Sequence, residues 1–144
     1  MIISVRNYSI RDASMDDVKD LSVVFSHTYP ESENTEWFFN YLLNGKTINR
    51  IAEINGKVVG FATATPKEEK IAMMDIFISP QHQGIGIGTT LFNDIKSNLT
   101  SNGFKEMCWA ADSNNHKALG FYKKMGAGNG QKQKDRVFYK INLG

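Results

Sequence analysis

The sequence has a single cysteine, three prolines and a net charge of only +2. One cysteine excludes an internal disulfide framework, and so small a charge does not indicate a nucleic-acid partner. No apolar run approaches the length of a membrane span, and residues 1–6 lack the apolar stretch of a signal peptide. These absences favour a cytoplasmic protein that binds neither nucleic acid nor membrane.

The three histidines, His27, His82 and His116, show no metal-ligand spacing, so we predict no metal site. Cys108 stands between Met107 and Trp109 in a predicted strand, which favours a buried, inert thiol. The length of 144 residues and the hydrophobic content of 41% are typical of one globular domain, residues 1–144.

Helix and strand patterns alternate along the chain. Asn55-Gly56 is a strong signal for a two-residue type I′ hairpin turn. Residues 66–69 are predicted to form the next turn, and the polar residues 126–135 a mobile hairpin loop. The pattern predicts the α/β (α+β) class, with one mixed, mostly antiparallel sheet flanked by helices. The expected strands are 8–12, 48–54, 57–65, 71–79, 104–111 and 136–142.

Residues 76–91 show a strand, a glycine-rich turn and a helix start in succession. The glycines Gly84, Gly86 and Gly88 allow the backbone to approach a ligand closely. The helix that follows presents unpaired N–H groups and the positive end of its dipole, which favour an anion. The segment therefore predicts a ligand that carries phosphate.

Two common phosphate-binding loops do not fit this segment. A P-loop requires Gly-Lys before Ser or Thr, whereas Gly88 is followed by Thr89 and Thr90. A dinucleotide-binding turn requires the spacing G-x-G-x-x-G, whereas these glycines are spaced G-x-G-x-G.

Two motifs resemble those of the GCN5-related N-acetyltransferase (GNAT) superfamily. The first is the pyrophosphate loop, Gln83-x-x-Gly86-x-Gly88, preceded by the strand end Ile78-x-Pro80. The second is a helix, Asn115-x-x-Ala118-x-x-Phe121-Tyr122-x-x-x-Gly126. Ala127 stands where the superfamily usually has an aromatic residue, which affects local packing more than chemistry.

The resemblance implies the acyl-CoA N-acyltransferase fold, in which two parallel central strands splay apart and the cofactor acetyl-CoA enters the gap. Here those strands match 71–79 and 104–111. The pyrophosphate is expected at the N–H groups of residues 84–89, and the pantetheine amides beside the backbone of Phe77 and Ile78. Lys123 and Lys124 are usual for a solvated helix face but could favour the 3′-phosphate. The implied cofactor-binding residues are Ile76, Phe77, Ile78, Gln83, Gly84, Ile85, Gly86, Ile87, Gly88, Thr89, Asn115, Ala118, Phe121 and Tyr122.

Tyr122 matches the superfamily tyrosine that acts as general acid toward the leaving thiolate. The alternative is that it packs on the sheet, a role for which Phe121 is the better candidate. Asp75 is the candidate general base, although strand alternation could turn it to the wrong face unless a β-bulge intervenes. Glu53, Glu68, His116 and a water chain are the other candidates for the base.

The resemblance implies an enzyme that transfers acetyl from acetyl-CoA to a primary amine of a small molecule. Glu31, Glu33 and Glu36 lie in the segment that lines the acceptor side, so the amine could be cationic, or the loop simply solvated. The acceptor could instead be a protein N-terminus or lysine. A non-catalytic acetyl-CoA-binding regulatory module is the alternative from another class. An exposed sheet edge would suit a monomer or a homodimer.

Overall fold

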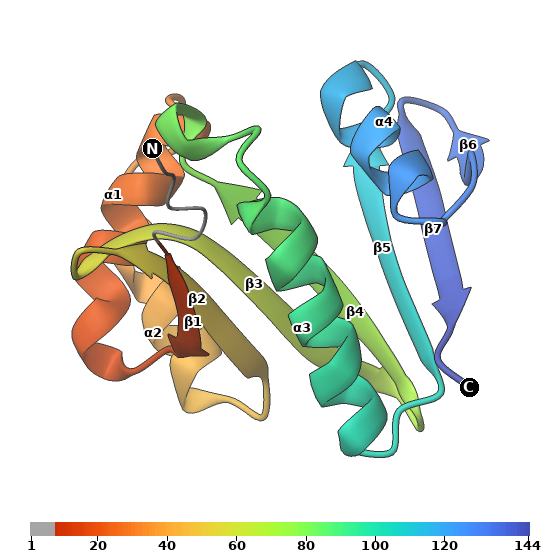
Figure 1. The fold of residues 1–144 in the computed structure, drawn as a ribbon, viewed down its shortest axis with the longest axis horizontal. Helices are drawn as coiled ribbons and strands as arrows, with labels where there is room; N and C mark the ends of the chain where they lie inside the picture. Colours follow the sequence, from red (N-terminus) through yellow and green to blue (C-terminus); the bar gives the residue numbers. More distant parts are fainter. Residues whose placement is uncertain (1–7) are drawn as a thin grey trace, which may run out of the picture.

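A computed structural model describes residues 8–144, so the expectation for residues 1–6 lies outside it. Within this range seven strands form one sheet in the order β1-β2-β3-β4-β5-β7-β6 (Figure 1). The strands are β1 (Ser9–Asp12), β2 (Ile48–Ile54), β3 (Lys57–Glu68), β4 (Ile71–Ile78), β5 (Glu106–Asp112), β6 (Gln131–Gln133) and β7 (Arg136–Asn142). The helices are α1 (Val18–Thr28), α2 (Glu36–Asn44), α3 (Ile87–Ser101) and α4 (His116–Lys124), with 3₁₀ turns η1 (Met15–Asp17) and η2 (Pro80–His82).

Neighbouring strands are antiparallel except for β4 and β5, which are parallel. The connection from β4 to β5 runs through α3, as a parallel crossover requires. This confirms the predicted mixed, mostly antiparallel sheet and the parallel central pair.

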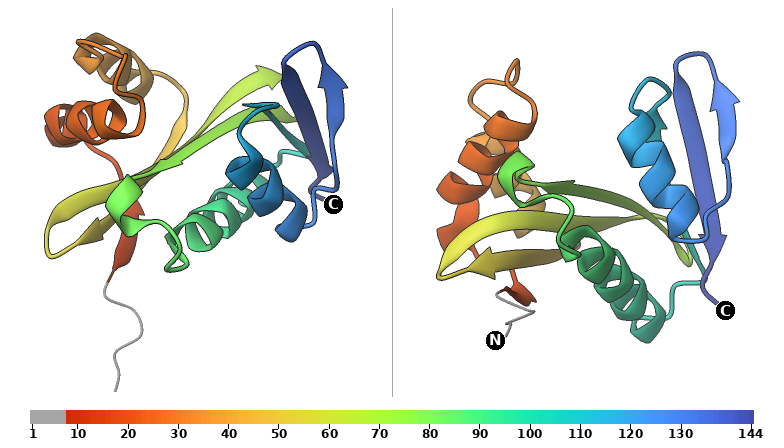
Figure 2. Two further views of the ribbon diagram at one scale, coloured as in Figure 1. Left: turned by 90° about the horizontal axis from the view of Figure 1, so that it is seen from above. Right: turned by 45° about the horizontal axis from the view of Figure 1, so that its top comes forward.

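The helices cover both faces of the sheet. Figure 2 shows α1 and α2 on one face, and α3 and α4 on the other. Phe39 packs with Phe61 and Phe77 on the first face, whereas Leu91 and Phe92 of α3 pack on the second. β3 lies between these two cores, which explains why its residues 58–64 are buried without interruption.

Two turns follow directly from glycine. Asn55 and Gly56 have φ of 51° and 81°, which confirms the type I′ turn between β2 and β3. Gly103, with φ of 86°, follows the last residues of α3, as expected for a C′ glycine.

The expected turn at 66–69 is wrong, and the expected hairpin loop at 126–135 contains more regular structure than predicted. β3 continues through Pro66 to Glu68, and the turn lies at residues 69–70. Pro66 is tolerated because β2 pairs with β3 only as far as Ala64, so the strand has one free edge there. The expected loop 126–135 contains β6, which pairs with β7. Its three residues are all exposed and polar, so no hydrophobic alternation marks the strand.

Candidate active site

The parallel strands β4 and β5 pair only near their beginnings. The pairing covers Ile71 to Met73 on β4 and Glu106 to Cys108 on β5. Beyond these residues the two strands no longer pair with each other. Figure 1 shows the widening gap between β4 and β5. A cleft of about 1320 Å³ occupies this part of the molecule. It lies at the carboxyl ends of two parallel strands, where α/β sheets bind ligands.

The cleft edge of β4 presents backbone groups that no neighbouring strand engages beyond Met73. Ser79 N–H donates to Val59 C=O at 2.8 Å, so Ser79 directs its backbone toward β3. Because an antiparallel ladder alternates, Phe77 and Asp75 do the same, whereas Ile76 and Ile78 direct theirs toward the gap. The residues that offer an edge for an added strand are therefore Ile76 and Ile78, and the expected pairing to Phe77 is corrected.

The glycine-rich loop leaves a row of N–H groups open. Gly84 and Gly86 have φ of 83° and 95°, conformations that favour glycine. Thr90 N–H makes the first bond of α3, to Gly86 C=O at 3.1 Å. Within residues 8–144 nothing accepts a hydrogen bond from the N–H groups of residues 84–89. These N–H groups and the positive end of α3 lie beside the cleft, an arrangement that favours an anion.

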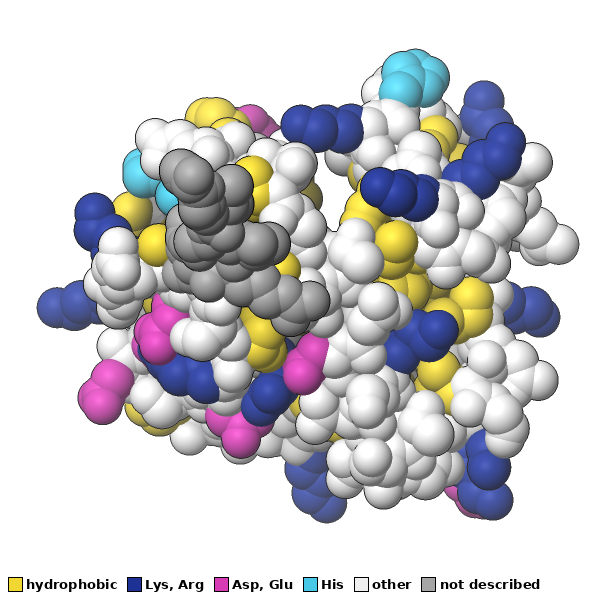
Figure 3. Space-filling model, in the orientation of Figure 1, with side chains coloured by type: hydrophobic (Ala, Val, Ile, Leu, Met, Phe, Trp, Pro, Cys, Tyr) yellow, Lys and Arg dark blue, Asp and Glu magenta, His cyan; other side chains and the backbone are white. Residues whose placement is uncertain are grey.

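Gln83 connects this loop to both neighbours. Its Nε2 donates to Ile78 C=O at 3.2 Å, and its Oε1 accepts from Lys117 Nζ of α4 at 2.6 Å. The side chain thus joins the end of β4 to α4 across the cleft mouth. Figure 3 shows the hollow between the two halves of the molecule, with Lys and Arg side chains near its rim.

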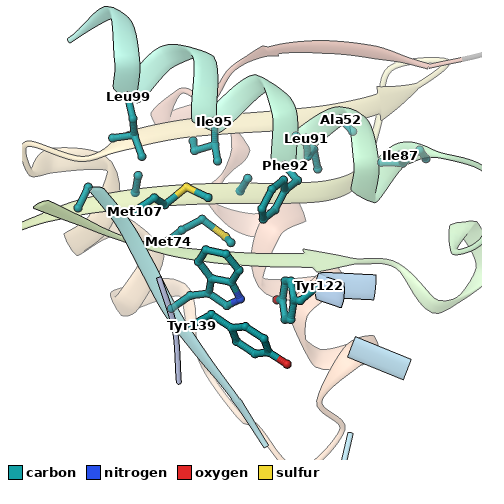
Figure 4. Close-up of a cluster of buried hydrophobic side chains, with 14 of the residues drawn as sticks. Ala52, Met74, Ile87, Leu91, Phe92, Ile95, Leu99, Met107, Tyr122 and Tyr139 are labelled. Atoms are coloured by element: carbon teal, nitrogen blue, oxygen red, sulfur yellow. The ribbon is translucent and has the colours of Figure 1, made fainter. Parts of the chain in front are cut away.

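Tyr122 of α4 lies in a cluster of aromatic side chains and also lines the cleft. Its ring is 5.2 Å from those of Trp109 and Tyr139, and Figure 4 shows it beside Tyr139 below Phe92. Burial, and then the negative charge of Asp75, raise the pKa of the phenol, which therefore stays protonated at neutral pH. Tyr122 is 7% exposed whereas Phe121 is only half-buried, so the expectation that Phe121 is the better packed of the two is wrong.

Asp75 lines the cleft without the bulge that we considered. Its pairing to Thr63 on β3 is regular, and the register shifts only near Pro66. Asp75 shares the face of Phe77, which is the face of α1 and α2. Desolvation raises the pKa of its carboxyl, while the N–H of Ile76, at 3.0 Å from Oδ1, and the charge of Arg136 lower it.

Asn115 caps α4 by accepting the N–H of Ala118 on its Oδ1 at 3.1 Å. The other end of α4 is a Schellman motif, in which Ala127 N–H donates to Tyr122 C=O at 3.0 Å and Gly126 has φ of 89°. Small Ala127 packs at this end, so the departure from the usual aromatic leaves the helix intact.

The chain also matches known proteins. The sequence profile of the acetyltransferase (GNAT) family matches residues 15–127. The chain belongs to the GNAT family. An uncharacterized N-acetyltransferase of Methanocaldococcus jannaschii is 26% identical over 138 residues, a match that covers 85% of this chain and 61% of that protein. Phosphinothricin N-acetyltransferase of Streptomyces viridochromogenes is 29% identical over 82 residues, 49% of this chain and 45% of that protein. The matched regions therefore span less than two thirds of these curated relatives.

Solved structures of other proteins share the GNAT fold. An N-acetyltransferase from Staphylococcus aureus has a TM-score of 0.81 at 17% identity, over 96% of this chain and 100% of that one. A GNAT phosphinothricin acetyltransferase from Sinorhizobium meliloti, solved with acetyl-CoA, has a TM-score of 0.79 at 20% identity, over 96% and 90%. These likenesses confirm the predicted fold class.

Some residues that we considered for this GNAT chain lie away from the cleft. The cleft lining includes neither Glu31, Glu33 and Glu36, the expected acidic rim, nor the alternative bases Glu53 and His116. Glu53 instead pairs with Arg11 at 3.2 Å. Glu68 does line the cleft, near the closed end where β4 pairs with β5.

Cys108 lines the cleft, and burial raises the pKa of its thiol, which keeps it in the unreactive form. Within residues 8–144 no cluster of His, Cys, Asp or Glu could hold a metal ion. No helix in the same range is long and apolar enough to cross a bilayer.

The cleft residues not foreseen from the sequence include Tyr29, Lys117 and Arg136. The ring of Tyr29 lies 4.8 Å from that of Phe25, and Tyr29 reaches the cleft. Lys117 donates a hydrogen bond to Gln83. It lies two residues after Asn115, within the predicted motif, and this position was the only sequence feature that could have indicated it. Arg136 reaches the cleft from the first residue of β7, and no local pattern marks it.

Proposed function

We propose that this chain is an acetyl-CoA-dependent N-acetyltransferase, acting on a primary amine of a small molecule. The observation that carries the proposal is the open gap between β4 and β5, flanked on one side by free N–H groups and on the other by Tyr122. The cofactor bound by relatives of this fold, acetyl-CoA or CoA, is named in the structures from Sinorhizobium meliloti and Thermoplasma acidophilum.

The cleft fits acetyl-CoA, which would supply an acetyl thioester. The N–H groups of residues 84–89 would hold the pyrophosphate, because a helix N-terminus and a chain of amides favour negative charge. Ile76 and Ile78 would pair with the pantetheine amides as one strand pairs with another. Phe121 and Ala118 provide apolar wall on the α4 side, and Lys117 and Lys124 provide positive charge at the mouth.

Transfer forms the N–C bond of the amide and breaks the C–S bond of the thioester. The ammonium group of the acceptor loses two protons, one of which ends on the sulfur and the other in solvent. Asp75 would accept a proton from the amine, and its raised pKa makes it a better base than an ordinary carboxylate. Tyr122 would donate to the sulfur, since its raised pKa keeps the phenol protonated until that step.

Binding and transfer can be measured separately. Calorimetric titration should show that acetyl-CoA binds, whereas ATP and NAD, which also carry pyrophosphate, do not bind in the same range. Mass spectrometry of an amine panel incubated with acetyl-CoA should then show acetylated products. Binding without transfer to any small amine, N-terminal peptide or lysine peptide would indicate a regulatory module, and transfer to peptides alone a protein acetyltransferase. Absence of binding would contradict the proposal.

A further inference from the structure

The arginines of residues 8–144 fall into two kinds. Arg11 pairs with Asp17 at 2.8 Å and with Glu53, and Arg50 pairs with Asp94 at 2.7 Å and with Asp12. Arg136, in contrast, makes no ion pair and no side-chain hydrogen bond within residues 8–144. A guanidinium presents five donors in a fork that matches a carboxylate, so a free one at a ligand site is well suited to bind an anion.

Arg136 also occupies a particular part of the cleft. It is the first residue of β7 and lines the cleft together with Asp75. The two are close enough for the positive charge of Arg136 to lower the pKa of Asp75, yet they form no ion pair. The Asp75 carboxylate and the Arg136 guanidinium thus line the same cleft without forming an ion pair with each other. A different cation, Lys117, lies beside the glycine-rich loop, where its Nζ donates to Gln83 Oε1 at 2.6 Å.

We propose that the acceptor is an amino acid or amino-acid-like molecule, whose carboxylate binds Arg136 while its amine faces Asp75. The inference rests on the proposed function and assigns its substrate class. A zwitterion places its two charges against groups of opposite sign, and the Arg–carboxylate pair can form two parallel hydrogen bonds. Binding of the substrate carboxylate to Arg136 then orients the substrate amine toward Asp75.

The neighbouring side chains agree with a small acceptor of this kind. Phe138 and Met73, at 45% and 46% exposure, lie on the same sheet face as Arg136 and Asp75 and line the same cleft. They offer apolar contact for an amino-acid side chain. Glu31, Glu33 and Glu36, the expected acidic rim, are not among the residues that line the cleft.

The test compares each free L-amino acid with its own amide, which keeps the amine and side chain but removes the negative charge. We expect at least one free acid to be acetylated with kcat/KM about tenfold or more above its amide, as for a charged hydrogen bond. Arg136→Gln should raise KM for that acid by a similar factor and leave KM for the amide unchanged. Arg136→Lys should recover part of the loss, because it restores charge without the fork.

Lys132→Gln, on the neighbouring exposed strand β6, removes the same charge away from the cleft and is the matched control. Thermal midpoints and acetyl-CoA affinity of each variant establish that fold and cofactor site are intact. Equal use of acids and amides, or an equal loss for both in Arg136→Gln, would overturn the inference while transfer itself stands. Failure to bind acetyl-CoA or to acetylate any amine would instead overturn the proposed function, and the inference with it.

Discussion

Asp75 and Tyr122 meet at one cleft although they belong to opposite faces of the sheet. Asp75 shares the face of Phe77 under α1 and α2, whereas Tyr122 packs in the core on the α3 face. They come close because no strand fills the space between β4 and β5 beyond Met73. Burial, and then the charge of Asp75, raise the pKa of Tyr122, so the phenol stays protonated beside the Asp75 carboxyl group at neutral pH.

The first prediction concerns Tyr122→Phe. This change removes one oxygen from a buried ring, so acetyl-CoA affinity should stay within about threefold, while kcat falls by about 10²–10⁴, the usual contribution of general acid catalysis. Steady-state kinetics at saturating substrates measure both. Tyr139→Phe removes the same oxygen from the adjacent ring and should leave kcat near wild type. Equal kcat in the wild type and Tyr122→Phe would exclude the acid role.

The second prediction concerns the pH dependence that Asp75 imposes. The base acts when deprotonated, so kcat/KM should rise with pH through a pKa above the ordinary carboxyl value, and Asp75→Asn should lose that limb and most of the rate. A rate limb that persists in Asp75→Asn would show that another group is the base.

Asp75 should also affect the stability of the folded protein, and the direction of this effect follows from its raised pKa. A carboxyl whose pKa is raised in the folded state favours folding when protonated, and this contribution is lost as pH rises through the folded-state pKa. At pH 7 the ionised group therefore opposes folding, and Asp75→Asn should raise the thermal midpoint slightly, because solvent screens the charge of this exposed side chain. At a pH below both pKa values the two proteins should converge. A lower midpoint for Asp75→Asn at pH 7 would contradict the assignment.

The third prediction concerns Gly88, in the first turn of α3. A Cβ at this position would lie 3.4 Å from the Phe121 ring, which the free protein accommodates with little change. Gly88→Val would project methyl groups into the cofactor approach and should weaken acetyl-CoA binding by about tenfold or more, a free-energy change of about 1.4 kcal/mol. Gly120→Val is the control, because Gly120 lies on α4 with open space around it. Equal acetyl-CoA affinities of the wild type and Gly88→Val, measured by calorimetry, would show that the pyrophosphate does not bind beside Gly88.

The fourth prediction compares two glycines before β7. Gly130 and Gly128 have φ of 66° and 72°, so alanine is strained at both. Only at Gly130 would the new Cβ collide, at 2.7 Å from Val137 and 2.8 Å from the backbone oxygen of Phe138. Gly130→Ala should therefore cost about 1–3 kcal/mol of unfolding free energy more than Gly128→Ala. Urea unfolding measures the difference, and equal losses would show that the segment before β6 relaxes freely around the new Cβ.

Much of the fold could be predicted because the turn residues and the periodicity of the apolar residues indicate the same helices and strands. Asn55-Gly56 marked a turn by the backbone angles that Asn and Gly favour, and the strand predicted at 57–65 lies within β3. Pro66 misled because its tolerance depends on where β2 stops pairing, which is a tertiary fact. β6 was missed because an exposed edge strand needs no apolar residue.

The candidate site divides in the same way. The glycine-rich loop and the α4 motif are local in sequence, so their residues could be listed from it. Arg136 and Tyr29 reach the cleft only through the register of β7 and the packing of Tyr29 on Phe25, neither of which a local pattern reveals. The direction of the β4 backbone depended likewise on one long-range bond, from Ser79 N–H to Val59 C=O.

Hydrogen exchange of individual backbone amides, measured with and without acetyl-CoA, locates the bound cofactor. Saturating acetyl-CoA should slow exchange at residues 84–89 and at Ile76 and Ile78, while amides of the distant β1–β2 pair keep their rates. If saturating acetyl-CoA instead slowed exchange only at other amides, the placement of the cofactor between β4 and β5 would be contradicted.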